Sequence, residues 1–150
     1  MKMFIIVTLN AGGHNATGQM VCHEISGVAT ASLDGTAHSI RDQTSVTTPT
    51  TNGIISNSIT TSAADYIFSA AYEFAVGGDT WTAGTTPNAF TYVGTNPAGL
   101  GSEYFVQSSS GILTSTMGSN RGSEFYVAII AFKPPSAGGV KRLRGAVVSR

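Results

Sequence analysis

The chain has 150 residues, eight basic and eight acidic side chains, one cysteine and 41% hydrophobic residues. This length and apolar content support one domain with a buried core and argue against disorder driven by charge. The charged fraction of 11% argues against a coiled coil, one cysteine excludes an intrachain disulfide, and no apolar stretch approaches the roughly 20 residues of a membrane-spanning helix.

The charges are distributed unevenly. Residues 1–133 hold four basic residues against all eight acids, a net charge of −4, and residues 134–150 hold four basic residues and no acid, a net charge of +4. We therefore expect a domain at 1–134 and a Gly-rich basic arm at 135–150. The arm fits a solvated tail as well as it fits an anionic surface or an acidic patch on a neighbouring copy. Four charges without interleaved aromatic residues are a weak nucleic-acid signal, and we expect no such partner.

The N-terminal residues Phe4–Leu9 predict a β-strand, because the apolar run stops at Thr8 and is too short for a signal peptide. Short apolar or alternating runs then recur between turn residues, as in an all-β sandwich or barrel. Further strands are predicted, in chain order, at Gln19–Ile25, Ile54–Thr60, Tyr66–Phe74, Phe90–Val93, Glu103–Ser108, Ile112–Thr116 and Glu124–Phe132. The polar stretches 29–52, 77–88 and 94–101 predict loops and turns.

Two of these segments are the most informative. Glu124–Phe132 is apolar on both faces, which predicts a central strand, and Pro134 and Pro135 end it. Tyr66–Phe74 is similar, and its small residues suggest that another layer packs closely on it. A helix over Ser62–Ala75 is the alternative because Ala and Glu favour helix, but the aromatic and β-branched residues favour a strand.

Candidate chemistry is sparse. Adjacent strand residues point to opposite faces, so His23 cannot converge with its neighbours Cys22 and Glu24 on one ligand, and we expect a buried structural Cys22. Motifs for nucleotide binding or a nucleophilic serine are absent, and we expect no metal and no cofactor. A carboxylate pair for glycoside hydrolysis depends on spacing in the fold, which the sequence does not show.

Loop aromatic residues are the one indication of a ligand. Trp81, with Tyr92 on a nearby strand, could form a platform on which a sugar stacks. The alternative, which we favour, is that Trp81 closes one end of the sandwich core, because aromatic side chains dominate core energetics.

Four segments carry a resemblance to a known type of module: His23–Ala29, Ala64–Ala70, Ser102–Gly111 and Val127–Pro134. Together they resemble the later strands of an uncharacterised jelly-roll-like β-sandwich module that recurs in bacterial surface proteins and phage structural proteins. The resemblance covers roughly residues 5–134 and offers no catalytic residues. Such modules usually have further strands before the position of Phe4–Leu9, which implies a sandwich incomplete at its N-terminal edge, where another chain could pair.

These observations predict a non-enzymatic structural protein of a repetitive assembly. We expect a phage virion component (decoration, fibre or tail protein) or a bacterial surface or filament subunit, located in the virion or at the cell surface. Its partners would be itself or other structural subunits. The expected assembly contacts are Phe4, Ile6, Lys141, Arg142 and Arg144. Two alternatives stay open: a carbohydrate-binding or adhesion module that uses Trp81 and Tyr92 on surface glycans, and a glycoside hydrolase or lyase.

Overall fold

The computed structural model describes residues 2–6, 22–29, 33–73, 80–96, 99–122 and 124–135. Every regular element in these ranges is a β-strand, and none of the described residues belongs to a helix long and apolar enough to cross a membrane. In chain order the strands are β1 (Lys2–Ile6), β2 (Cys22–Ser26), β3 (Leu33–Gln43), β4 (Thr50–Ile55), β5 (Ile59–Thr61), β6 (Tyr66–Glu73), β7 (Trp81–Ala83), β8 (Thr91–Asn96), β9 (Leu100–Val106), β10 (Gly111–Leu113), β11 (Thr116–Ser119) and β12 (Phe125–Phe132).

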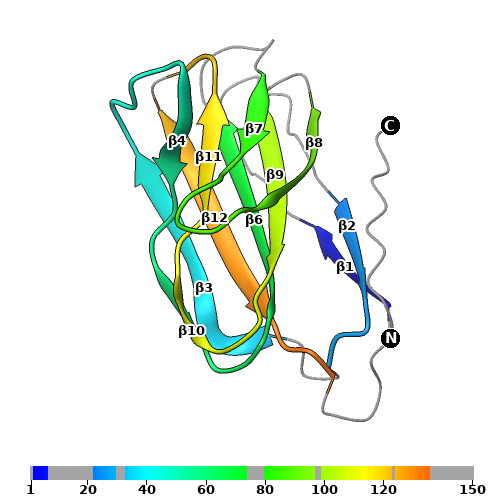
Figure 1. The fold of residues 1–150 in the computed structure, drawn as a ribbon. Helices are drawn as coiled ribbons and strands as arrows, with labels where there is room; N and C mark the ends of the chain where they lie inside the picture. The colour runs from blue at the N-terminus through cyan, green and yellow to red at the C-terminus, as the bar shows by residue number, and fades with distance from the viewer. Residues whose placement is uncertain are drawn as a thin grey trace, which may run out of the picture.

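Most of the strands form two antiparallel sheets that face each other (Figure 1). The larger sheet has the order β3-β12-β6-β9-β8, and the smaller has the order β4-β11-β7. The chain runs from β4 into β5 and from β10 into β11, and β5 pairs with β10. These short strands extend the smaller sheet beyond a break at residues 56–58 and 114–115. The predicted all-β antiparallel sandwich is confirmed.

The pairing follows the winding of a jelly roll, in which a long hairpin folds over into two sheets. The first strand of the sandwich, β3, pairs with the last, β12, and the β4–β5 segment pairs with β10–β11. β6 pairs with β9, and β7 leads into β8 at the turn of the long hairpin, where the Phe90 amide donates to the Gly84 carbonyl at 2.9 Å. β12 and β6, the most apolar strands, are therefore central strands of the larger sheet, with a neighbouring strand on each side.

Some predicted elements differ from those observed. Residues 66–73 form strand β6, so the alternative of a helix over Ser62–Ala75 is wrong. The segment predicted as one strand, Ile54–Thr60, is interrupted between β4 and β5. Strands β3 and β7 lie in stretches predicted as loops. The predicted strand Ile112–Thr116 is divided between β10 and the first residue of β11. Phe4 and Ile6 lie in β1, which pairs with β2 in a separate two-stranded sheet. The edge strands of the larger sheet are therefore β3 and β8, not the N-terminal strand.

A third layer covers part of the outer face of the larger sheet. Ile25 of β2 and Val28, just after it, are buried against outward-facing residues of β6, β9 and β12, among them Phe68 and Leu100. The Ala29 amide donates to the Lys133 carbonyl at 3.1 Å, which ties this layer to the end of β12. The layer explains why β6 is apolar on both faces, as the small residues of this strand indicated.

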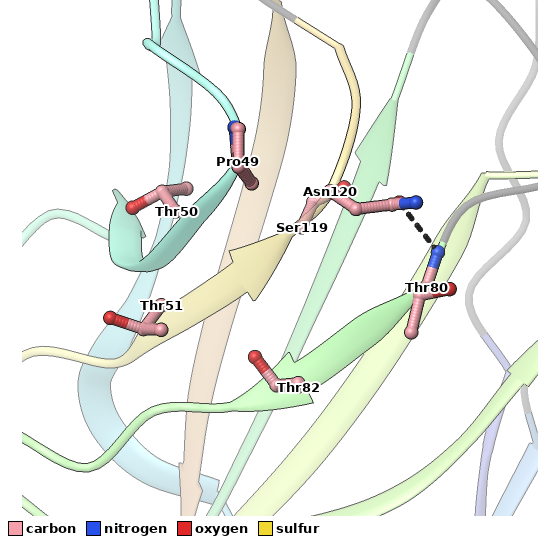
Figure 2. A pocket seen from close by; sticks show the side chains of 7 residues that line it. All are labelled: Pro49, Thr50, Thr51, Thr80, Thr82, Ser119 and Asn120. Atoms are coloured by element: carbon pink, nitrogen blue, oxygen red, sulfur yellow. Dashed lines mark hydrogen bonds between the residues drawn. The ribbon is translucent and has the colours of Figure 1, made fainter.

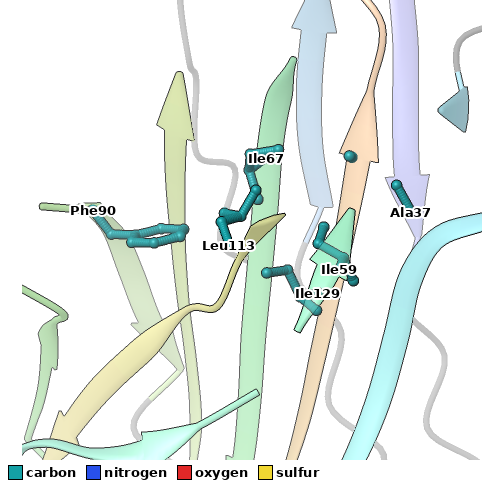
Figure 3. Packing of buried hydrophobic residues seen from close by; sticks show 7 residues of the cluster. Ala37, Ile59, Ile67, Phe90, Leu113 and Ile129 are labelled. Carbon is teal, nitrogen blue, oxygen red and sulfur yellow. The ribbon is translucent and has the colours of Figure 1, made fainter. Parts of the chain in front are cut away.

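The space between the two sheets holds two separate apolar clusters. One lies where the short strands β5 and β10 cover the larger sheet (Figure 3) and contains Ala37, Ile59, Ile67, Phe90, Leu113, Ile129 and Ala131. The other lies under β4, β7 and β11 and contains Ile54, Ala71, Trp81, Met117, Phe125 and Val127. The break in the smaller sheet separates the two clusters. Ile59 of β5 and Leu113 of β10 belong to the first cluster, and Ile54 of β4 and Met117 of β11 belong to the second.

Three buried serines cross the sandwich at this break. The Ser56 amide donates to the Ser115 carbonyl at 3.1 Å, and the Ser115 amide donates to Ser56 Oγ at 2.9 Å, so the broken ladder is replaced by a local exchange. Ser115 Oγ then meets Ser69 Oγ of the opposite sheet at 2.6 Å, and Ser69 Oγ donates to the Ala128 carbonyl at 3.0 Å. We call Ser56, Ser69 and Ser115 the serine bridge.

Side chains of β3 close one side of the sandwich. The side-chain amide of Gln43 bonds to the backbone of β4 as a neighbouring strand would. Its Nε2 donates to the Gly53 carbonyl at 2.6 Å, and its Oε1 accepts from the Ile55 amide at 2.7 Å. Arg41 Nη1 donates to the Ile55 carbonyl at 3.2 Å. These contacts occupy the edge of β4, so polar residues of β3 point inward.

Replacing Ser69 with Ala should lower the free energy of unfolding by about 1–3 kcal/mol, because it leaves the buried Ser115 hydroxyl without its partner in the opposite sheet. The Ser69→Ala/Ser115→Ala double variant should lose less than the sum of the two single variants, since it removes both hydroxyls. Denaturant titration measures these values, with exposed Ser109→Ala as the control. A Ser69→Ala variant as stable as the control would contradict the bridge.

Candidate functional site

Trp81 lies inside the sandwich. Its side chain is 4% exposed, and its ring meets Phe125 edge to face with 5.8 Å between centroids. A Cβ at Gly101 would fall 2.6 Å from the Trp81 ring, so the ring rests directly on the backbone of β9, where only glycine fits. Tyr92 is half-buried against the same cluster. The faces of Trp81 are covered, and the structure supports its role in the core over a role as a sugar platform.

The other residues singled out from the sequence are placed only in part. Phe4 and Ile6 lie in the β1–β2 hairpin. Lys141, Arg142 and Arg144 lie outside the described residues, and their role as assembly contacts stays a prediction. In the described part of the chain, no three His, Cys, Asp or Glu side chains are grouped as metal ligands would be.

An open groove of about 520 Å³ lies on the outer side of the smaller sheet (Figure 2). Its lining contains only uncharged residues: Pro49, Thr50, Thr51, Thr80, Thr82, Ser119 and Asn120. We call this the hydroxyl groove. Thr51 and Thr82 flank β11 from the neighbouring strands β4 and β7 (Figure 2).

Internal contacts fix part of the hydroxyl groove. Asn120 Oδ1 accepts from the Thr80 amide at 2.8 Å, and Thr50 Oγ1 accepts from the Gly53 amide at 2.8 Å. Thr51, Thr82 and the Asn120 side chain are exposed. The groove therefore presents hydroxyl and amide groups beside threonine methyl groups, without a charge, which suits a neutral polyhydroxylated ligand.

Glu103 is a carboxyl group in the interior of the sandwich. It is directly opposite Ser69 in the β6–β9 ladder, so it shares the level of the serine bridge, and its side chain is fully buried. Its Oε2 accepts from the Gly84 amide at 2.9 Å. Burial raises the pKa of Glu103 to about 8, and the bond from Gly84 only partly offsets that effect. Glu103 is therefore protonated at neutral pH.

Asp34 and Asp65 form a buried carboxyl pair, at the opposite end of the sandwich from the hydroxyl groove. The amide and hydroxyl of Ser62 donate to Asp34, and Lys133 Nζ lies 3.2 Å from it. Burial acts to raise the pKa of Asp34, but the bonds from Ser62 outweigh it and hold the pKa well below its usual range. Burial and the adjacent Asp34 raise the pKa of Asp65 to about 7.

The carboxyl pair has a structural task. Asp34 joins the start of β3 to the β5–β6 loop through the two bonds from Ser62, and to the segment after β12 through the ion pair with Lys133. Both aspartates are buried, and Asp65 is fully enclosed. A glycoside hydrolase needs two carboxyl groups that reach a sugar from opposite sides, and this enclosed pair does not offer that geometry.

An exposed apolar surface lies on the outer face of the larger sheet. Ile40 of β3 is directly opposite Ala128 of β12 and is 73% exposed. Tyr126, next outward residue along β12, is 41% exposed, and Ala128 and Ile130 are half-buried. Ile25 and Val28 of the third layer pack on β6, β9 and the end of β12. Ile130 borders this cluster, and Ile40, Tyr126 and Ala128 lie outside it. We call Ile40, Tyr126, Ala128 and Ile130 the apolar strip.

Sequence reasoning missed the hydroxyl groove and the apolar strip. The threonines of the groove are scattered over residues 50–82, and they become neighbours only because β11 lies between β4 and β7. Ile40 was placed in a loop because β3 was not recognised. Residues 38–42 alternate between the two faces of β3, with His38, Ile40 and Asp42 on one face and Ser39 and Arg41 on the other. This alternation was the available signal for a strand.

No protein-family model, curated protein or solved structure matches the chain. The resemblance to a jelly-roll module of surface and virion proteins therefore stays a prediction, and the functional proposal depends on the geometry of the described residues.

Replacing Glu103 with Gln should flatten the pH dependence of stability. A folded pKa raised from 4.5 to about 8 means that the contribution of Glu103 to stability is fully present below pH 4.5 and is lost as the pH rises toward 8. The variant keeps the acceptor for Gly84 and has no proton to lose, so it should be roughly 2–4 kcal/mol more stable than the wild type at pH 9.

The measurement is denaturant unfolding at several pH values between 5 and about 9, where the linkage acts. Glu124→Gln changes an exposed glutamate and serves as the matched control. A Glu103→Gln variant that loses as much stability with rising pH as the wild type would show that Glu103 is already ionised in the fold.

Proposed function

We propose that the chain is a non-enzymatic structural subunit of a repetitive assembly, such as a phage virion or a bacterial surface layer or filament. The apolar strip supports this proposal most directly. Exposed apolar residues scattered singly are ordinary, but a contiguous patch on a sheet face marks a contact with another protein. Ile40 and Tyr126 are exposed beside the half-buried Ala128 and Ile130, so the strip is contiguous.

The buried polar groups support the same proposal. Glu103 accepts from the Gly84 amide inside the sandwich, and Asp34 is held by Ser62 and Lys133. These carboxyl groups are buried and bind groups of the protein itself, which supports a role in stabilising the connections between strands. A rigid sandwich with an exposed apolar face fits a building unit better than an enzyme.

Purified protein should form particles with a multiple of the 15.4 kDa chain mass, measured by sedimentation velocity and seen by negative-stain microscopy. Ala128→Glu puts a charge into the apolar strip and should weaken the association at least about tenfold, because a buried unpaired carboxylate is costly. Thr60→Glu changes an exposed residue of β5 and should leave the particle size unchanged. A wild-type protein that stays monomeric up to about 100 µM would overturn the proposal.

The hydroxyl groove favours a second candidate, the binding of neutral glycans. The lining offers hydroxyl, amide and methyl groups and no charge. This site is separate from Trp81, whose ring is covered, so the candidate differs from the aromatic platform expected from the sequence. Neutral sugars are held by such directional hydrogen bonds over a shallow surface.

Affinity electrophoresis through dextran, xylan or β-glucan tests this candidate. The wild type should be retarded by at least one of these polysaccharides, and the Thr51→Val/Thr82→Val variant should not, because it removes two hydroxyls of the groove and keeps their shape. Thr60→Val removes an exposed hydroxyl elsewhere and should behave as the wild type. Equal migration of all three proteins would exclude the groove as a glycan site for these polymers.

A further inference from the structure

The free edge of β3 lies directly beside the apolar strip. β3 has eleven residues and is the longest of the described strands, and β12 is the only one of those strands that pairs with it. A long strand edge offers backbone donors and acceptors to another strand. The edge of β4, on the same side of the sandwich, is occupied by the side chains of Gln43 and Arg41. The fold therefore closes one of two adjacent edges and leaves the other for a partner.

We propose that two copies of the chain pair β3 with β3, antiparallel, about a two-fold axis at Ile40. The inference rests on the proposed function and adds a contact at the strand edge beside the apolar strip, where the partner is a second copy of this chain. The two five-stranded sheets would become one continuous sheet. Pairing of this kind is self-complementary, because each contact occurs twice across the axis.

Polar side chains on either side of Ile40 select the partner and the register. His38, Ile40 and Asp42 alternate along the outer face of β3, and both His38 and Asp42 are exposed. With the axis at Ile40, His38 lies opposite Asp42 of the partner subunit, and the reverse pair forms on the other side of the axis. An imidazole opposite a carboxylate is a favourable cross-strand pair.

Other registers lose this match. The outer faces of the two sheets stay on the same side only when the two-fold axis passes through a residue of β3, so the alternative registers have the axis at Ser39 or Arg41. An axis at Ser39 puts Ile40 opposite the partner's His38, and an axis at Arg41 puts Ile40 opposite the partner's Asp42. Only the axis at Ile40 joins the two apolar strips, because Ile40 lies beside Ala128 in each copy and the two isoleucines meet at the seam.

One side chain now covers part of this edge. Asn57 Nδ2 donates to the Ile40 carbonyl at 3.2 Å and to Ser39 Oγ at 3.0 Å, and both bonds are exposed. Exposed hydrogen bonds of this kind contribute little net stability, so the backbone ladder between the two β3 strands and the contact between the two Ile40 side chains outweigh them.

Cysteine cross-linking in a Cys22→Ser background tests the register. Opposite residues of an antiparallel pair have Cα atoms about 4.5–5.5 Å apart, within reach of a disulfide. Ile40→Cys should therefore oxidise to a covalent dimer. His38→Cys and Asp42→Cys should each stay unlinked alone, because identical positions lie about 13 Å apart, and should cross-link when mixed.

Sedimentation equilibrium supplies the second readout. Ile40→Asp should raise the dimer dissociation constant by roughly 100-fold or more, because two carboxylates would face each other at the axis. Ile112→Asp is the matched control, since Ile112 is 74% exposed on β10 and Ile40 is 73% exposed. The control should stay within about threefold of the wild type.

The outcomes separate this inference from the proposed function. A wild-type assembly that persists in Ile40→Asp, or that cross-links through His38→Cys alone, overturns the β3 pairing and leaves the assembly proposal intact. A protein that is monomeric by sedimentation overturns the assembly proposal itself, and the pairing with it.

Discussion

The two sheets are joined in the middle of the sandwich by hydrogen bonds between buried polar groups. The smaller sheet breaks at residues 56–58 and 114–115, and Ser56 and Ser115 at that break are buried, where an unpaired backbone group costs free energy. Ser56 and Ser115 satisfy each other across the break, and Ser115 reaches Ser69 on the opposite sheet. Glu103, at the same level as Ser69, receives the Gly84 amide at the end of β7.

This polar layer, formed by the serine bridge and Glu103, determines how the core and the smaller sheet are arranged on either side of it. The apolar core divides into two clusters, and the smaller sheet can change direction between β4 and β5 without losing its partners. The upper part of the smaller sheet then forms the hydroxyl groove on its outer side. On the outside, the described residues present the hydroxyl groove and the apolar strip, and the two functional proposals rest on these surfaces.

The sequence predicted the class of fold and the central strands, because burial on both faces leaves a plain apolar signature in residues 125–132 and 66–73. It did not predict β3, whose inward Arg41 and Gln43 bind the backbone of β4 instead of packing in the core. β7 and β11 have three and four residues, too few for a period to appear. The burial of Trp81 was one of the two expectations for that residue. Ile40, Thr51 and Thr82 gained their functional meaning only from their neighbours in the fold.

Native-state hydrogen exchange of the Ser115 and Gly84 amides tests the central role of the polar layer most directly. Both amides lie outside the strand ladders and donate only to side-chain oxygens, Ser56 Oγ and Glu103 Oε2. If the layer holds the sandwich together, both should exchange only through global unfolding, with the same free energy as the amides of β6 and β12. Exchange at the rate of an exposed loop amide would contradict the account, because the layer would then open while the sheets stay intact.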